Sequence, residues 1–392
     1  MASVIDSLRG GFTEPRRDAL WGHIYLTPEL EAVSESEPFM KLHRIMQLGP
    51  AYLCYPGATH TRAAHSFGVY HLTRRILLHL AKEGADAVLH REGVMSMLCA
   101  ALLHDAGHYP YAHSLKELPL AAHEALSARL IQTEPLASLI GKTGADPAFT
   151  AAIIDQTIDG AGSELALYRT VLSGSLDPDK LDYLNRDARC CGVPYGAQDV
   201  DFVISKLHYG RDGLQIDAQG VPSVESVLFS KYLMYRSVYW HRRVRCATSM
   251  VKKAVYLGLR DGIVQKEDFY EIDDAELFAL LPAERHPAFA LAQKVRRGQL
   301  FTLVRESRYN EAEHSGILPL ENRLAEEERI AAELSREDKA HGKALKPEQV
   351  VIDIPEEIVF ETGMRLGGGV FDNGIVDSFS SALRMVRVYA EI

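Results

Sequence analysis

The sequence has little cysteine and no long apolar run. Its five cysteines include the adjacent pair Cys190 and Cys191 and form no CxxC motif, so neither a disulfide framework nor a zinc–cysteine site is expected. The longest apolar run, Val94 to Leu103, contains Ser96 and is half the roughly 20 residues that a membrane span needs. Residues 1–14 carry no apolar stretch typical of a signal peptide. These absences predict a cytoplasmic protein without a membrane segment.

Basic residues are outnumbered by acidic ones. The chain has 43 Lys plus Arg against 53 Asp plus Glu, a net charge of −10. This balance excludes a uniformly basic surface, so nucleic acid is not an expected partner. The remaining composition, 47% apolar and 24% charged over 392 residues, is that of a globular protein long enough for two or three domains.

Histidine, in contrast, is concentrated in one part of the chain. Nine of the 16 histidines lie between His60 and His123, where an even distribution would place between two and three. Histidine is the commonest metal ligand and titrates near neutral pH. The clustering therefore indicates a functional site in this segment.

The distribution of apolar residues predicts three regions. Residues 1–37 form an irregular N-terminal segment with one short strand, Leu20 to Leu26. Residues 38–262 have apolar residues at helical spacing and form the main core. Residues 263–392 contain prolines, a charged stretch and the β-branched run Val350 to Ile354, which indicate a smaller mixed lobe. The expected fold class is mainly α, a helical core with a smaller α+β C-terminal lobe.

Four residues from three separate stretches carry a metal-binding signal: His65, His104, Asp105 and Asp179. Two imidazoles and two carboxylates can form a mixed site for a divalent cation such as Mg²⁺, Mn²⁺, Fe²⁺ or Zn²⁺. The helical spacing places Asp105 on the buried side of its helix, where a bound cation would offset the cost of burying a carboxylate. Asp177-Pro178 predicts a helix start, so Asp179 lies in the first turn, where the helix dipole favours its ionised form. A structural hydrogen-bonded His–Asp pair is the alternative.

Further motifs accompany this set in a fixed order. They are Gly22–Ile24, Gln47–Gly49, Tyr55–Ala58, Arg62–Gly68, His104–His113, His123–Glu124, Asp177–Gly192 and Val238–Arg245. Together they resemble the HD-domain metal-dependent phosphohydrolases, and within them the deoxynucleoside triphosphate triphosphohydrolase branch, its bacterial members in particular. The resemblance runs from about Asp18 to Leu259.

The resemblance implies an HD-domain helical core, a divalent metal ion and three sets of site residues. The implied metal ligands are His65, His104, Asp105 and Asp179. The residues that would bind the sugar and the phosphates are Gln47, Leu48, Arg62, Lys180, Tyr183, Asp187 and Arg236. The histidines that would face the α-phosphate are His108, His113 and His123, with His113 first and His123 second as the proton donor to the leaving oxygen.

The activity implied by the resemblance is hydrolysis of deoxynucleoside triphosphates to deoxynucleoside and triphosphate, by attack of water at the α-phosphate. It also implies a homo-oligomer, a dimer or tetramer. Helical spacing agrees independently with part of this site, because Asp179, Tyr183 and Asp187 are four residues apart and project from one face. Asp182 and Arg186 lie beside that face and are predicted to form an ion pair.

Two departures from the family pattern concern the proton donor and regulation. Many relatives carry an acidic residue three positions after the equivalent of His113, where this chain has Lys116. If that carboxylate orients the histidine in the relatives, Glu117 or Glu124 would have to orient it here. The positions upstream of Gln47 that read an activating guanine in some relatives hold Glu35, Met40 and His43. We therefore expect no activation by GTP through that route.

Two other functions remain open on the sequence alone. One is an HD phosphatase or phosphodiesterase that acts on nucleoside monophosphates or other phosphoesters. The other is a catalytically silent, nucleotide-binding regulatory module that has kept the fold.

Overall fold

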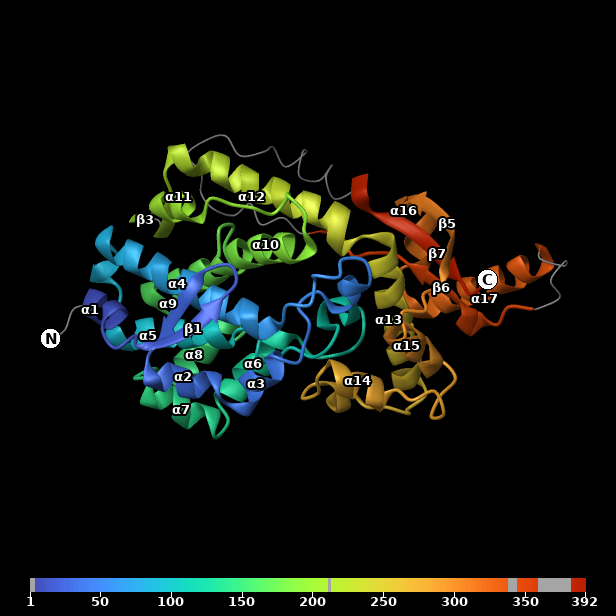
Figure 1. Ribbon diagram of the computed structural model, residues 1–392, viewed down its shortest axis with the longest axis horizontal. Helices are drawn as coiled ribbons and strands as arrows, with labels where there is room; N and C mark the ends of the chain where they lie inside the picture. The colour runs from blue at the N-terminus through green and yellow to red at the C-terminus, as the bar shows by residue number, and fades with distance from the viewer. Residues whose placement is uncertain (1–3, 211–212, 338–343, 359–381) are drawn as a thin grey trace.

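The computed structural model describes residues 4–210, 213–337, 344–358 and 382–392. It is mainly helical, with small antiparallel sheets and a mixed α+β region at its C-terminal end, which confirms the predicted fold class. The two termini lie at opposite ends of the molecule (Figure 1).

Helices α1 to α13 occupy the N-terminal two thirds, where α4 packs against both α5 and α10. In order they are α1 Val4–Arg9, α2 Pro28–Ser34, α3 Glu37–Leu42, α4 Arg62–Lys82, α5 Arg91–Leu103, α6 His123–Ile131, α7 Leu136–Lys142, α8 Pro147–Ile154, α9 Ser163–Ser173, α10 Pro178–Cys191, α11 Val200–Ser205, α12 Val221–Met234 and α13 Arg242–Arg260. The C-terminal part adds α14 Asp274–Leu280, α15 Phe289–Arg296, α16 Glu311–His314 and α17 Leu320–Glu337.

The strands form three small antiparallel sheets. Two are hairpins, and the third has the order β5-β7-β6 in the C-terminal lobe. The strands are β1 Glu14–Asp18, β2 Gly22–Leu26, β3 Leu207–Gly210, β4 Gly213–Ile216, β5 Thr302–Arg308, β6 Val350–Asp353 and β7 Met385–Ala390.

Capping residues determine where the site-bearing helices begin and end. Thr61 accepts a hydrogen bond from the backbone N–H of Ala64 at the start of α4. In α10, Asp177 accepts one from the N–H of Lys180, Pro178 occupies the first turn, and Gly192 closes the helix with a φ of 68°. The predicted boundaries of α10 are therefore confirmed, and they place Asp179 in the first turn.

Two expectations about local structure were wrong. The predicted strand Leu20 to Leu26 is present as β2, but residues 1–37 also hold α1, α2 and β1, which pairs with β2 in a hairpin; the sequence of β1, EPRRD, has no apolar alternation that would reveal it. Asp105 does not lie within its helix, because α5 ends at Leu103. Asp105 lies in the following turn, where it is nevertheless buried.

The apolar interior divides into two main clusters. The first joins α4, α5, α8, α9 and α10. The second joins α13, α14 and α15, and it also takes in Tyr109, Ala112, Leu115, Leu118 and Leu126 from the segment after Asp105. This histidine-rich segment therefore packs on residues of the C-terminal lobe.

Helices α4 and α10 approach each other closely at Gly68. A Cβ atom on Gly68 would lie 1.8 Å from Asp182 Oδ1 and 2.7 Å from Arg186 Nη2. We predict that Gly68→Ala lowers the free energy of unfolding by about 1–3 kcal/mol, because the added methyl group has no space. The measurement is chemical denaturation. Gly141→Ala is the control, since its Cβ would meet nothing within 4 Å; equal destabilisation by both substitutions would contradict the prediction.

Candidate metal centre

Three side chains from α4, the end of α5 and α10 converge at the centre of the first cluster. His65 Nε2 lies 2.9 Å from Asp179 Oδ1, and His104 Nε2 lies 3.9 Å from the same oxygen. Their ligand atoms all fall within 4.8 Å of one another. This spacing suits one cation held by two imidazole nitrogens and a carboxylate.

The hydrogen bonding of His104 fits a metal ligand. His104 Nδ1 lies 2.9 Å from the carbonyl oxygen of Ala101; a carbonyl can only accept, so Nδ1 carries the proton. In the neutral ring, Nε2 then carries the lone pair. This buried nitrogen has no hydrogen-bond partner among the described residues, which is expected if its lone pair binds a cation.

His65 is fixed by carboxylates on both sides. Its Nδ1 lies 2.8 Å from Asp182 Oδ2, opposite the Asp179 contact. Burial favours the neutral ring, but the hydrogen bonds to Asp179 and Asp182 outweigh it and raise the pKa of His65 to about 10. A cation at Nε2 must therefore displace a proton, while Asp182 keeps the ring in orientation.

Asp182 is itself held in place by two further groups. Arg186 donates to both of its oxygens at 2.8 and 2.9 Å, and the indole N–H of Trp21 donates to Oδ1 at 2.5 Å. The predicted ion pair between Asp182 and Arg186 is therefore present. It supports the ring of His65 through the buried carboxylate.

Asp105 borders the same cluster. Its Oδ1 lies 3.4 Å from His104 Nε2, and its Oδ2 accepts a hydrogen bond of 2.7 Å from Arg62. Burial opposes its ionised form, but His108, His104 and Arg62 nearby hold the pKa of Asp105 well below its usual range. Asp105 is therefore an anion at neutral pH, as a ligand requires.

A stack of three histidines adjoins Asp105. The rings of His108 and His123 are nearly parallel with centroids 3.8 Å apart, and His113 meets His108 edge-on at 4.8 Å. His108 and His123 also lie 3.3 and 3.9 Å from Asp105 Oδ1. All three predicted histidines are thus brought together. Burial, together with the neighbouring Arg62, lowers the pKa of His108 well below its usual value.

The two glutamates that could replace the carboxylate lost at Lys116 have different positions. Glu124 Oε2 lies 3.2 Å from His123 Nδ1. Glu117 instead contacts Lys252 of α13 at 2.5 Å and Arg323 of α17 at 3.0 Å. Glu124 is therefore the carboxylate placed to orient a histidine, and that histidine is His123.

Three of the predicted substrate residues pair within the protein. Arg62 pairs with Asp105, and Lys180 donates to Asp177 Oδ2 at 2.6 Å. Asp187 is buried, its Oδ1 2.7 Å from His60 Nε2 and its Oδ2 2.6 Å from the Tyr239 hydroxyl.

The other predicted substrate residues occupy different surroundings. Gln47 has a buried side-chain oxygen without a hydrogen-bond partner among the described residues. Leu48 and Tyr183 are partly buried against the first cluster. Arg236 is exposed, and its Nη1 lies 3.2 Å from the hydroxyl of Tyr232.

Sequence reasoning missed His60 and Tyr239 as site residues. Tyr239 ends a single π-helical turn, Tyr235–Tyr239, which separates α12 from α13 and turns its side chain toward α10. Such turns often occur at functional sites, but no residue pattern marks one. His60 could have been found only through its contact with Asp187.

Comparison with family models matches two consecutive regions. Residues 62–153 match the HD domain, and residues 198–387 match the HD associated region. The first match contains the candidate ligands His65, His104 and Asp105, and the second contains Tyr239 and all of α14. The chain belongs to the HD-domain phosphohydrolase superfamily.

Several proteins resemble this chain. An uncharacterized protein of Methanocaldococcus jannaschii is 31% identical over 68% of this chain and 54% of its own length. A human deoxynucleoside triphosphate triphosphohydrolase is 25% identical over 66% of this chain and 45% of its own. The chain spans about half the length of the curated relatives it matches.

A solved structure has the same fold over nearly the whole chain. The hypothetical protein from Aquifex aeolicus has a TM-score of 0.70 at 25% identity, with 96% of each chain covered. A phosphohydrolase from Bacteroides thetaiotaomicron, at 20% identity, has a TM-score of 0.74 over 96% of this chain and 99% of its own. Within the described parts of the chain, every helix is too short or too polar to cross a membrane.

We predict that Asp182→Asn weakens metal binding by about 10- to 100-fold, because His65 loses the carboxylate that orients its ring. The measurement is the dissociation constant for Mn²⁺ of the folded, metal-depleted variant. Asp201→Asn is the control, since the Asp201 side chain is 82% exposed. Unchanged Mn²⁺ affinity in Asp182→Asn would contradict the role of Asp182.

The pair of His60 and Asp187 predicts a pH dependence of stability. Burial disfavours the charged ring, but the hydrogen bond and charge of Asp187 outweigh it and raise the pKa of His60 to about 9. Since this value exceeds that of an unfolded chain, the stabilisation is complete below about pH 6.5 and is lost as the pH rises through about 9.

His60→Gln should therefore be less stable than the parent by on the order of 3 kcal/mol at pH 6, and the gap should shrink by pH 10. Urea denaturation of both proteins at the two pH values measures it. A gap that is constant or grows with pH would refute the assignment.

Proposed function

We propose that the protein hydrolyses deoxynucleoside triphosphates to deoxynucleoside and triphosphate with the aid of a divalent metal ion. The observation that carries this proposal is the ligand group of His65, His104 and Asp179 beside the stack of His108, His113 and His123. The first group could bind a cation, and the adjacent histidines could transfer a proton. The substrate class rests on the resemblance of the motifs and on the activity in the name of the human relative.

His65, His104, Asp105 and Asp179 would hold the cation in this proposal. When bound, a divalent cation polarises a phosphate oxygen and lowers the pKa of its water. The protein's own contribution begins with Arg62, which lies at the start of α4 and pairs with Asp105. A phosphate group of the substrate would compete with Asp105 for the guanidinium of Arg62, whose positive charge would stabilise the phosphate oxygens.

His123 is the proton donor that the geometry favours. Its Nδ1 lies 3.2 Å from Glu124 Oε2, and its Nε2 lies on the side of Asp105, 3.9 Å from Oδ1. Burial lowers the pKa of His123, so the ring is neutral before substrate binds. A polyanionic triphosphate nearby favours the protonated ring, which can then deliver a proton to the leaving 5′-oxygen.

A second candidate is a phosphatase or phosphodiesterase of the same superfamily. One observation favours it: Arg62, Lys180 and Asp187 all have partners within the protein. These internal pairs would have to break before the side chains could bind a substrate, and a substrate with fewer phosphates would require fewer of them to break. The chemistry at the metal centre would be the same.

The proposal also includes a cytoplasmic location, expected from the cysteine content of the sequence, and a homo-oligomer, a dimer or tetramer, expected by resemblance to the family. Light scattering on the purified protein tests the assembly.

Incubation of metal-loaded protein with each of the four deoxynucleoside and four ribonucleoside triphosphates tests the activity. We predict inorganic triphosphate as the product of the deoxynucleotides, separated by anion-exchange chromatography. His104→Ala and treatment with a chelator should each abolish it, because both remove the cation.

Other products would point elsewhere. Orthophosphate or a nucleoside monophosphate would favour the phosphatase or phosphodiesterase. Deoxynucleotide binding without turnover, unchanged in a folded His104→Ala variant, would favour a regulatory module and overturn the enzymatic proposal.

A further inference from the structure

The candidate site is assembled from two different cores. The helices that carry His65, His104 and Asp179 pack in the first apolar cluster. The segment that carries His108, His113 and His123 places Tyr109, Ala112 and Leu115 in the second cluster, with α13, α14 and α15. The distance between the metal ligands and the histidine stack therefore depends on how the C-terminal lobe holds this segment.

The turn between His108 and His113 contains an unusual backbone conformation. Tyr111 has a φ of 60° and is the one residue other than glycine with a positive φ among those that the structure describes. A side chain with a Cβ atom adopts this left-handed conformation at an energetic cost, so the surroundings must maintain it. Residues in such a state cluster at functional sites.

The ring of Tyr111 is held from two sides. On one side it lies against Gly49, where a Cβ atom would be 3.7 Å from the ring. Gly49 itself has a φ of 49°, which favours glycine at this position. On the other side, Phe278 of α14 meets Tyr111 edge-on, with centroids 6.4 Å apart and an interplanar angle of 88°.

The same short helix also holds the segment that leads to Gln47. Asp274 accepts a hydrogen bond of 2.9 Å from the backbone N–H of Met46, and Asp273 accepts one of 2.7 Å from Arg44 Nε. Helix α14 therefore contacts both the turn of the histidines and the segment next to a predicted substrate residue. Figure 1 shows α14 at the lower edge of the C-terminal lobe, on the side nearest α3 and α6.

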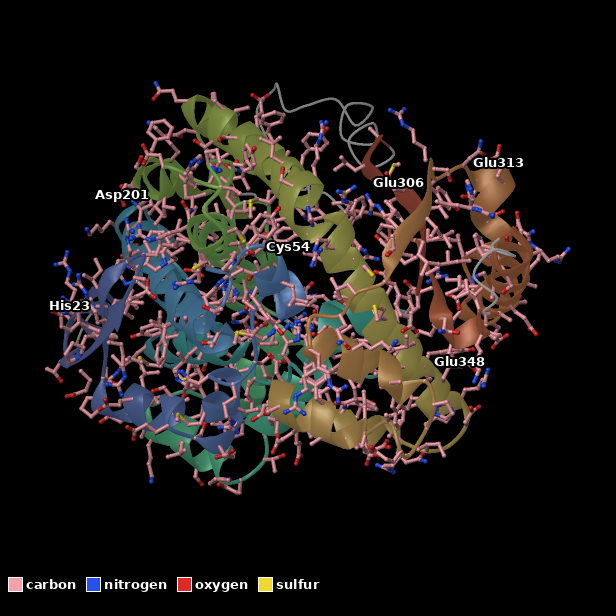
Figure 2. The ribbon with its side chains drawn as sticks, turned by 45° about the vertical axis from the view of Figure 1, so that its right-hand side comes forward. His23, Cys54, Asp201, Glu306, Glu313 and Glu348 are labelled. Carbon is pink, nitrogen blue, oxygen red and sulfur yellow. The ribbon has the colours of Figure 1, made fainter. Side chains whose placement is uncertain are left out.

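The side-chain view shows the central position of this junction. In Figure 2, Cys54, which follows the 3-10 helix Gly49–Leu53, lies between the end marked by His23 and Asp201 and the lobe marked by Glu306, Glu313 and Glu348. The residues around Gly49 pack on both clusters, Leu48 on the first and Leu53 on the second, and Tyr111 packs on Gly49 from the histidine turn.

We infer that Tyr111 is a positioning residue, through which Phe278 of α14 fixes the His108–His113 turn relative to the metal ligands. The C-terminal lobe then acts on catalysis without touching substrate. This inference rests on the proposed function for its effect on rate, but its structural part, a turn locked by α14, stands independently of the substrate.

Phe278→Ala removes the ring that supports Tyr111, and Tyr111→Gly removes the Tyr111 ring while tolerating the positive φ. In each variant we expect faster amide hydrogen exchange confined to residues 108–118, with α4 and α10 unchanged. Because His108 of this turn stacks on the proton donor His123, a displaced turn would disturb the alignment of His123, and kcat should fall about 10- to 100-fold while Mn²⁺ content stays the same. Phe278→Tyr keeps an aromatic ring and should restore both the exchange pattern and kcat.

Phe202→Ala is the matched control, since Phe202 on α11 is a 40% exposed phenylalanine away from this junction. Folded variants of Phe278 and Tyr111 with normal exchange over residues 108–118 would overturn the inference. So would increased exchange spread equally over both cores, which indicates a merely structural role. If the parent protein releases no triphosphate, the proposed function fails, while the exchange pattern still decides whether α14 locks the turn.

Discussion

The structure depends on several carboxylates that are held beside imidazoles where α4, α5 and α10 meet. Asp179 and Asp182 flank His65, and Asp105 lies beside His104 and Arg62. Burying so many charged groups is tolerable only when each has a partner. Arg186 neutralises the charge of Asp182, and the indole N–H of Trp21 donates a hydrogen bond to it. The imidazole nitrogens and carboxylate oxygens on the inner side of the site can then bind a cation. The same charges that hold the helices together therefore define the candidate centre.

The second apolar cluster supports the histidine-bearing segment, which the first cluster does not hold in place. Of the candidate metal ligands, His65 and Asp179 lie on α4 and α10, whose ends are fixed by Thr61, Asp177 and Gly192, and His104 and Asp105 directly follow α5. The histidine stack lies instead on a segment of turns and short helices, which cannot hold its own geometry. Its apolar residues gain that support from α13, α14 and α15. Helix α14, which supports this segment, lies within the match to the HD associated region, outside the match to the HD domain.

Much of the site was predictable because it is local or repeats with the helix. The capping pattern around Asp177 gave the bounds of α10, and helical spacing placed Asp182 beside Arg186. Contacts between distant segments were not predictable from one sequence. Asp187 with His60 and Tyr239, and Tyr111 with Phe278, join residues 50 to 170 positions apart, and nothing in their local patterns distinguishes them. The β1 strand was not predicted for another reason: its five residues lack the apolar alternation that indicates a strand.

The central claim is that His65, His104, Asp105 and Asp179 bind a divalent cation. Pulsed electron paramagnetic resonance of Mn²⁺ added to metal-depleted protein measures this directly through nitrogen couplings. The account predicts couplings from imidazole nitrogens that diminish in His65→Ala and in His104→Ala. A spectrum of fully hydrated Mn²⁺, or imidazole couplings unaffected by both substitutions, would contradict it.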